Sequence, residues 1–225
     1  MPKPSRGVLT RVLLTALTLA LAAGVLLSSS AASAASRRPD ALADAAKAAL
    51  AVLGQRQQVQ SAVAGHVLTP DDPVVAASDA SFAGARSAVA SLAAPRAGVD
   101  PAALDAAWAQ ATEPRLIAML AALSQVGVPY RGYKASPEAG FDCSGLTMWA
   151  WGQAGIHLAH QSGVQISSSA PRSLDQLQPG DLVQYPGHVM MSLGLGSAIV
   201  HAPHTGKTVE VKAWSKARRG ASPLG

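Results

Sequence analysis

The pattern of hydrophobic and polar positions changes twice along the chain. Residues 12–27 (VLLTALTLALAAGVLL) form an uncharged apolar run, and the region that follows is rich in alanine with few large side chains. Beyond residue 114, larger apolar and aromatic residues alternate with glycine-rich turns. We therefore predict a leader segment, an Ala-rich helical extension or linker, and a C-terminal domain. Their boundaries are 1–34, 35–114 and 115–225.

The Ala-rich extension has the spacing of three helices. The first is predicted over residues 40–64, where apolar positions recur at helical intervals. Glycine and proline residues predict a loop over 65–81. A second helix is predicted over 82–94, stopped by Pro95, and a third from 100 to about 112. With so few large side chains, the extension is either a helical hairpin that leans on the next domain or a partly ordered spacer.

The C-terminal domain begins with helices and continues with strands. Glycine and proline residues end two predicted helices and separate four short β-prone segments. An order of helices followed by an antiparallel meander indicates an α+β domain. The predicted helices span 115–126 and 143–154, the loops 130–142 and 156–180, and the strands 181–185, 188–193, 197–201 and 208–212.

The N-terminus has the three parts of a secretory signal peptide. Residues 1–11 contain three basic residues and no acid, the apolar run follows, and Ala32-Ser33-Ala34 fits the small-x-small rule for cleavage. The alternative is a retained anchor, although the sixteen apolar residues are fewer than the roughly 20 of a typical span. We expect cleavage near Ala34, no stable membrane span afterwards, and a secreted protein in the cell wall or outside it.

The net charge is unevenly distributed. The full chain has a formal charge of +5, but three basic residues lie in the predicted signal peptide, so the excess is no evidence for nucleic-acid binding and we expect none. Residues 35–114 carry a net charge of −2 and residues 115–225 a net charge of +4. The opposite signs favour an intramolecular contact between the two regions. A mildly basic domain also suits an acidic polymer such as a cell wall.

Cys143 is the single cysteine of the chain, so it forms no internal disulfide. A lone thiol in an exported protein with histidines elsewhere is a candidate nucleophile, and a small buried apolar residue is the alternative. Cys143 lies where a predicted loop turns into a helix. The free backbone N–H groups of a helix start favour a thiolate, lower its pKa and can hold an oxyanion.

Two histidines are predicted to lie together in the strands. His188 begins one strand and His201 ends the next, which places them nearly opposite each other across the turn at 194–196, roughly 5 Å apart at Cβ. His201 can then hold one imidazole nitrogen of His188 and leave the other for Cys143. A zinc site of these three residues with His204 is the alternative, but the spacing fits no ligand pattern, so we expect neither metal nor cofactor.

Three ordered motifs resemble the NlpC/P60 family of cysteine peptidases. Residues 140–146 (GFDCSGL) are similar to its F-D-C-S-G-L nucleophile motif, and residues 177–183 (LQPGDLV) to its L-x-P-G-D-L-V segment. Residues 187–189 (GHV) and 199–203 (IVHAP) resemble its two histidine segments, and 129–130 (PY) its P-Y pair. The resemblance covers residues 116–214, under half of the chain.

This resemblance implies a papain-like α+β fold with the nucleophile helix packed on an antiparallel sheet. It implies Cys143 as nucleophile, His188 as base and His201 as the third polar residue. The substrate-binding residues it implies are Tyr130, Asp142 and Ser144.

The family's usual substrate is the bond between D-glutamate and a diamino acid in a peptidoglycan stem peptide. The expected function is therefore that of a secreted cysteine endopeptidase acting on peptidoglycan. Two other functions stay open: an inactive wall-binding or scaffolding protein, and an amidase or acyltransferase on the same fold.

Two segments depart from the family pattern. Residues 131–134 (RGYK) replace an aromatic residue and a Gly-Gly pair, and residues 158–162 (LAHQS) place His160 where an arginine is common. Both segments are expected to line the cleft, so they affect substrate preference more than the catalytic residues.

Overall fold

The structure, a computed structural model, describes residues 40–224. The predicted signal peptide lies outside these residues. Among residues 40–224, no helix combines the length and the apolar character needed to cross a membrane.

Aspartates begin each of the three helices of the extension. α1 spans Ala41–Ala64, α2 spans Pro73–Ala97 and α3 spans Pro101–Ala109. The side chain of Asp40 accepts hydrogen bonds from two backbone amides at the start of α1, and Asp72 and Asp100 each accept one in the same way. These caps satisfy N–H groups that have no partner within the helix. The helix predicted over residues 40–64 is confirmed.

The second helix is longer than predicted. It begins at Pro73 and continues past Pro95 to Ala97, so the loop predicted over 65–81 is wrong for its second half. The Asp72-Pro73 pair supplies an N-cap and a first-turn proline, whose fixed φ suits a helix start. Pro95 lies in the last turn, where few further backbone hydrogen bonds depend on it.

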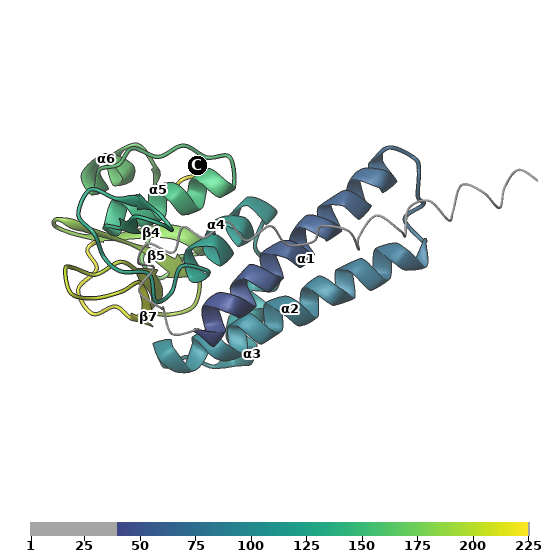
Figure 1. The fold of residues 1–225 in the computed structure, drawn as a ribbon, viewed down its shortest axis with the longest axis horizontal. Coiled ribbons are helices and arrows are strands. Elements are labelled where there is room, and N and C mark those ends of the chain that lie inside the picture. Colours follow the sequence, from purple (N-terminus) through teal and green to yellow (C-terminus); the bar gives the residue numbers. More distant parts are fainter. Residues whose placement is uncertain (1–39, 225) are drawn as a thin grey trace, which may run out of the picture. The chain divides into compact units, whose positions relative to one another are not determined.

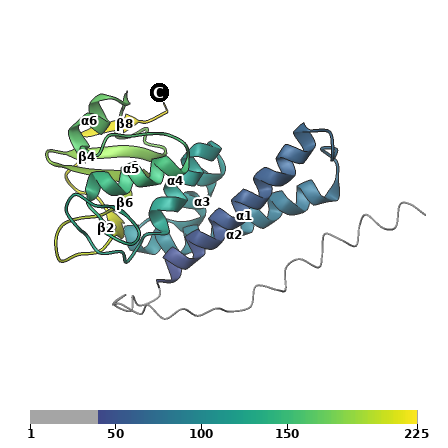
Figure 2. The same ribbon diagram turned by 45° about the horizontal axis from the view of Figure 1, so that its top comes forward.

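The three helices pack onto the C-terminal elements. α1 and α2 lie side by side, as Figures 1 and 2 show; α1 also contacts α4, and α2 contacts α3, β6 and β7. Trp108 of α3 is fully buried and donates its indole N–H to the carbonyl oxygen of Leu193 at 2.7 Å. Of the two alternatives, the structure contains the helical hairpin.

Apolar side chains, and not opposite charges, hold this contact. Phe82 and Trp108 belong to the same hydrophobic core as residues of the sheet. Every ion pair among residues 40–224 lies either within the extension or within the C-terminal elements, and none joins the two. The contact expected from the opposite net charges exists, but no direct ion pair among residues 40–224 supports it.

The C-terminal elements are helices and one antiparallel sheet (Figure 1). The six strands follow the order β3-β8-β4-β5-β6-β7, and a small hairpin of β1 and β2 precedes α5. The helices are α4 (Glu113–Leu123), α5 (Cys143–Gln153) and α6 (Ser162–Ser167). The strands are β1 (Ala135–Ser136), β2 (Gly140–Phe141), β3 (Ala170–Arg172), β4 (Pro179–Tyr185), β5 (His188–Leu193), β6 (Ala198–His201), β7 (Glu210–Ala213) and β8 (Arg219–Ser222).

The sheet has α4 and α5 on one face. Both helices contact the central strands, and alternate strand residues such as Val189 and Met191 join their core. Met190, between them, belongs to a smaller cluster with Val183 and Ile199, against which Trp214 packs. The predicted α+β architecture, with the nucleophile helix on an antiparallel sheet, is confirmed. The predicted meander corresponds to β4 to β7.

A buried ion pair fixes α4 to the sheet. Arg115 Nη1 lies 2.6 Å from Asp181 Oδ1 and 3.0 Å from the carbonyl oxygen of Pro179, and Nη2 donates to Ser222 Oγ at 2.8 Å. Both charged groups are almost fully buried. Because these bonds reach β4 and β8 together, they position the helix that precedes the Cys143 loop.

Candidate active site

Cys143 is the first residue of α5, and the preceding aspartate organises this start. Asp142 is the N-cap: its Oδ1 accepts from the amide of Gly145 at 2.7 Å and from Ser144 Oγ at 3.2 Å, and its Oδ2 accepts from the amide of Tyr133 at 2.8 Å. The carboxylate therefore ties the incoming loop to the helix start. This arrangement holds the cysteine at the turn from strand to helix.

Gly145 is required by the close approach of the loop. A Cβ at this position would collide with the backbone oxygen of Lys134 and lie 3.0 Å from His160 Nε2. Lys134 also accepts a hydrogen bond from the amide of Asp142 at 2.9 Å. The glycine of the motif thus lets the loop at 131–134 lie directly on the first turn of α5.

The two predicted histidines meet, and α5, which begins with Cys143, contacts the strand that begins with His188. His188 Nε2 is 2.8 Å from His201 Nδ1, and both rings are buried. The backbone amide of Val189, the residue after His188, is close enough to the Cys143 sulfur to act on the thiol and lower its pKa. The two histidines were predicted to lie nearly opposite each other; the register of β5 and β6, which pairs Met191 with Val200, makes them diagonal neighbours. Diagonal positions remain within reach of long side chains.

Glu210 extends this row of polar groups. Its Oε1 lies 3.3 Å from His201 Nε2, and the backbone register pairs the two residues across β6 and β7. An ionised carboxylate only accepts hydrogen bonds. Nε2 of His201 therefore carries the proton, its Nδ1 accepts from His188 Nε2–H, and Nδ1 of His188 is left as a free base. Glu210 was not predicted as a site residue.

Burial is the largest influence on the pKa values of Cys143 and His188. Burial raises the pKa of the Cys143 thiol, and the Asp142 charge adds to this, while backbone N–H groups including that of Val189 act in the opposite direction. Burial also lowers the pKa of His188 to about 4, helped by His201 and His204. Both directions favour the uncharged forms of the thiol and the imidazole. The backbone N–H groups at the helix start lower the thiol pKa as expected, but desolvation outweighs them, so the net pKa is raised.

The side chains expected to bind substrate lie around Cys143. The pKa of Tyr130 is raised mainly by burial, and the nearby charges of Cys143 and Asp142 raise it further. Ser144 is buried, and its hydroxyl donates to Asp142. The Tyr185 ring stacks on the His188 ring at a centroid distance of 4.9 Å and covers one of its faces.

His160 also belongs to this cluster. Its Nε2 lies 2.9 Å from Asp142 Oδ1, the oxygen that caps α5. The departure at His160 noted in the sequence therefore lies at the start of α5. The fourth ligand of the zinc alternative, His204, bonds the carbonyl oxygen of Thr205 instead. Among residues 40–224, no group of three or more His, Cys, Asp or Glu side chains could hold a metal ion.

Comparison with known proteins gives matches over the C-terminal half. Residues 127–219 match the model of the NlpC/P60 family. Probable endopeptidase Rv2190c of Mycobacterium tuberculosis is 43% identical over 100 residues, which are 43% of this chain and 26% of that protein. Murein DD-endopeptidase MepH of Escherichia coli is 30% identical over 122 residues, 50% of this chain and 45% of that protein.

Two further matches carry peptidoglycan in their names. Peptidoglycan endopeptidase RipA of Mycolicibacterium smegmatis is 37% identical over 105 residues, 40% of this chain and 21% of that protein. The crystal structure of the NlpC/p60 domain of the peptidoglycan hydrolase SagA is 31% identical with a TM-score of 0.44, and the match covers 48% of this chain and 97% of that one. The chain spans about a quarter of the length of the first curated relatives it matches. Cys143, His188, His201 and Glu210 all lie within residues 127–219.

Proposed function

Residues 127–219 belong to the NlpC/P60 family, and from this premise we propose that the protein is a peptidoglycan endopeptidase that hydrolyses stem-peptide amide bonds with Cys143 as its nucleophile. The observation that carries the proposal is the row of contacts at the start of α5. The Val189 amide acts on the Cys143 thiol, and the residue before it, His188, is hydrogen-bonded to His201, whose Nε2 lies 3.3 Å from Glu210. The names of RipA and MepH support peptidoglycan as the substrate class.

The proposed reaction begins with proton transfer. His188 Nδ1 takes the proton of the Cys143 thiol, and the thiolate attacks the carbonyl carbon of the scissile amide. The oxyanion that forms is stabilised by backbone N–H groups at the start of α5. The His188 imidazolium gives its proton to the departing amine as the C–N bond breaks, which leaves an acyl-enzyme on Cys143.

Hydrolysis of the acyl-enzyme restores the resting state. His188 takes a proton from water, the hydroxide adds to the thioester, and the thiol leaves with the proton returned to sulfur. His201 keeps the imidazole of His188 oriented throughout, and Glu210 keeps the proton of His201 on Nε2. Because the uncharged forms of the thiol and the imidazole are favoured at rest, the ion pair forms during reaction and not before it.

The substrate and its binding residues are part of the proposal. The scissile bond is that between D-glutamate and the diamino acid, by resemblance to the family. Tyr130, Asp142 and Ser144 line the approach to Cys143. Because the Asp142 carboxylate already accepts three hydrogen bonds from the loop and helix, its contribution to binding combines with its role as the N-cap. The protein is proposed to act in the cell wall or outside the cell, exported by the signal peptide at 1–34.

Identification of the reaction products tests this function. The purified protein is incubated with defined muropeptides that carry either meso-diaminopimelate or lysine, and the products are identified by mass spectrometry. The proposal expects two fragments from cleavage after D-glutamate, with the mass of one water added. Release of the whole stem from muramic acid would instead indicate an amidase, and transfer to an added amine an acyltransferase. Intact muropeptides with retained wall binding would indicate a scaffolding protein.

A further inference from the structure

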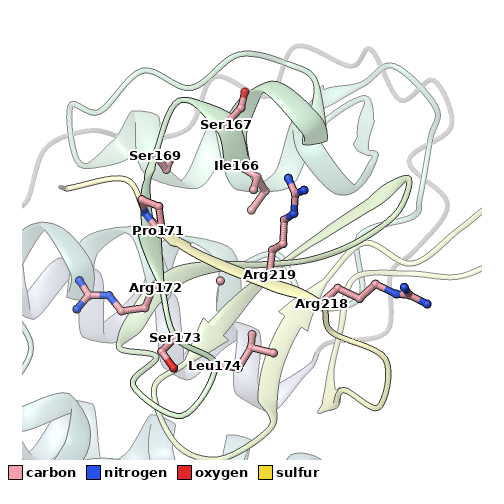
Figure 3. Close-up of a pocket in the computed structure, with 10 residues that line it drawn as sticks. Ile166, Ser167, Ser169, Pro171, Arg172, Ser173, Leu174, Arg218 and Arg219 are labelled. Carbon is pink, nitrogen blue, oxygen red and sulfur yellow. The ribbon is translucent and has the colours of Figure 1, made fainter.

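A cavity of about 530 Å³ lies at the β3–β8 edge of the sheet, outside the site built around Cys143. Figure 3 shows its walls, which come from α6, from the segment through β3, and from the start of β8. Arg219 of this wall pairs with Gln184, the neighbour of Tyr185. Because Tyr185 stacks on His188, the cavity lies at the same end of the sheet as the proposed catalytic residues, on the other side of β4.

The lining of this cavity is cationic. Three of its ten lining residues are arginines and none is acidic. Arg218 and Arg219 are exposed, and neither forms an ion pair with another residue of the range 40–224. The third, Arg172, lies 3.4 Å from Asp181, but that carboxylate is already paired with Arg115. Two guanidinium groups share one carboxylate, so this corner of the fold keeps an excess positive charge.

The serines of the cavity contribute less to recognition than the arginines. The hydroxyls of Ser167 and Ser169 donate to backbone carbonyls of α6, and that of Ser173 donates to Asp175. With their protons already committed, these groups have no donor left for an anion. Recognition of a ligand here rests on the charge of the guanidinium groups.

The directions of the arginines indicate the shape of the ligand. In Figure 3, Arg172 and Arg218 extend to opposite sides of the cavity, and Arg219 rises from β8 toward α6. The three guanidinium groups do not converge on one point, so a single small oxyanion cannot contact all of them. An extended chain with several negative groups can pass from one to the next.

We propose that this cavity and its arginines bind an extended polyanion of the cell wall, beside the catalytic cleft. The proposal rests on the proposed function, because a wall hydrolase works on a polymer that carries oxyanions in series. These oxyanions have two sources, the carboxylates of stem peptides and the phosphodiesters of an attached wall polymer. Both pair with guanidinium groups in the same way. Binding at this position would hold the enzyme on the wall while a neighbouring stem enters the Cys143 site.

A wall-binding assay tests the proposal. The full chain with Cys143→Ala is sedimented with isolated cell walls over a range of salt concentrations. Arg218→Gln with Arg219→Gln is expected to weaken binding about tenfold at low salt, which is the effect of about 1.4 kcal/mol from two exposed charge contacts. It should also flatten the dependence of affinity on salt. Lys47→Gln with Lys207→Gln removes the same charge from two exposed positions outside the cavity lining and should change binding little.

Treated walls distinguish the two sources of oxyanions. Hydrofluoric acid removes phosphodiester polymers, and carbodiimide coupling to an amine neutralises carboxylates. The treatment that abolishes the difference between the arginine variant and the lysine control identifies the ligand. Equal binding by the two variants on untreated walls at low salt would overturn the proposal.

Cleavage of soluble muropeptides separates this inference from the proposed function. With Cys143 intact, the arginine variant should cleave a soluble muropeptide at the rate of the unmodified protein, because the cavity does not touch the reacting atoms. A reduced rate on the soluble substrate would place the arginines in catalysis and refute a wall-binding role. Absence of muropeptide cleavage by the unmodified protein would count against the proposed function, regardless of the result of the wall-binding assay.

Discussion

Trp108 is the residue on which the attachment of the extension can be tested most sharply. It is fully buried in α3, and its indole N–H donates to the carbonyl oxygen of Leu193 at 2.7 Å, 85 residues along the chain. Trp108→Ala removes the largest side chain that the extension contributes to the shared core. It also leaves the Leu193 carbonyl without this donor.

The expected loss of stability is large. Truncation of a buried tryptophan to alanine costs about 3–5 kcal/mol, which includes the cavity that remains. Trp108→Phe keeps most of the apolar surface and loses the hydrogen bond, at a cost of about 1–3 kcal/mol for an unsatisfied buried carbonyl. Since domains are stable by only about 5–15 kcal/mol, the alanine variant loses a substantial share of the total.

Urea unfolding followed by circular dichroism measures both effects. With a slope of about 2 kcal/mol per molar urea, Trp108→Ala should lower the midpoint by about 2 M, and Trp108→Phe by about 1 M. Tyr133→Ala is the control, because that side chain is 94% exposed and its loss should be nearly neutral. An unchanged midpoint in Trp108→Ala, or a separate early transition for the extension alone, would show that α1 to α3 do not share a core with the catalytic domain.

Three further predictions concern the site. Gly145→Ala should greatly reduce both activity and stability, because the new Cβ collides with the Lys134 carbonyl. Gly152→Ala in the same helix is the control: its Cβ meets nothing within 4 Å, and it should stabilise the protein by up to about 1 kcal/mol. Equal melting temperatures of the two variants would contradict the steric argument. Glu210→Gln should lower kcat about tenfold with KM unchanged, since an amide no longer dictates which nitrogen of His201 carries the proton. Glu138→Gln makes the same change at an exposed residue and serves as the control. A normal kcat for Glu210→Gln would remove Glu210 from the mechanism. Because the pKa of His188 is lowered to about 4 in the folded protein, the unfolded chain binds the proton more tightly. About 3 kcal/mol of stability that is present above pH 6.5 should therefore be lost as the pH falls toward 4. Unfolding at several pH values measures this loss, and the same pH dependence in a His188→Gln variant would refute the assignment.

The sequence predicted the architecture where local signals were strong. The helix over 40–64, the helix that begins at Cys143 and the strands from 181 onward are carried by apolar periodicity and by glycine and proline boundaries. β3 and β8 were missed because their short sequences, APR and RGAS, lack a hydrophobic alternation. Their pairing depends on strands distant in sequence, which single-segment patterns do not report.

The same limit applies to the site. His188 and His201 were identified because one tight turn joins their strands, and the distance between their rings follows from local register. Glu210 was missed because its contact with His201 depends on the later pairing of β6 with β7. His160 reaches Asp142 through the path of an irregular loop, for which the sequence has no periodic signal. The lowering of the Cys143 pKa by the helix start was predicted, but the larger opposing effect of burial was not, because burial is a property of the whole fold.

The central claim, that Cys143 is the nucleophile of an amide-bond hydrolase, is tested most directly by the kcat/KM of Cys143→Ala on a muropeptide that contains the D-glutamyl–diamino acid bond. Cys143 is half-buried and its removal leaves the Asp142 cap and the core of α5 intact, so the variant should unfold at nearly the same temperature as the unmodified protein. We predict a loss of activity to the background rate. Cleavage of the same bond within tenfold of the unmodified rate, by a folded Cys143→Ala protein, would contradict the account.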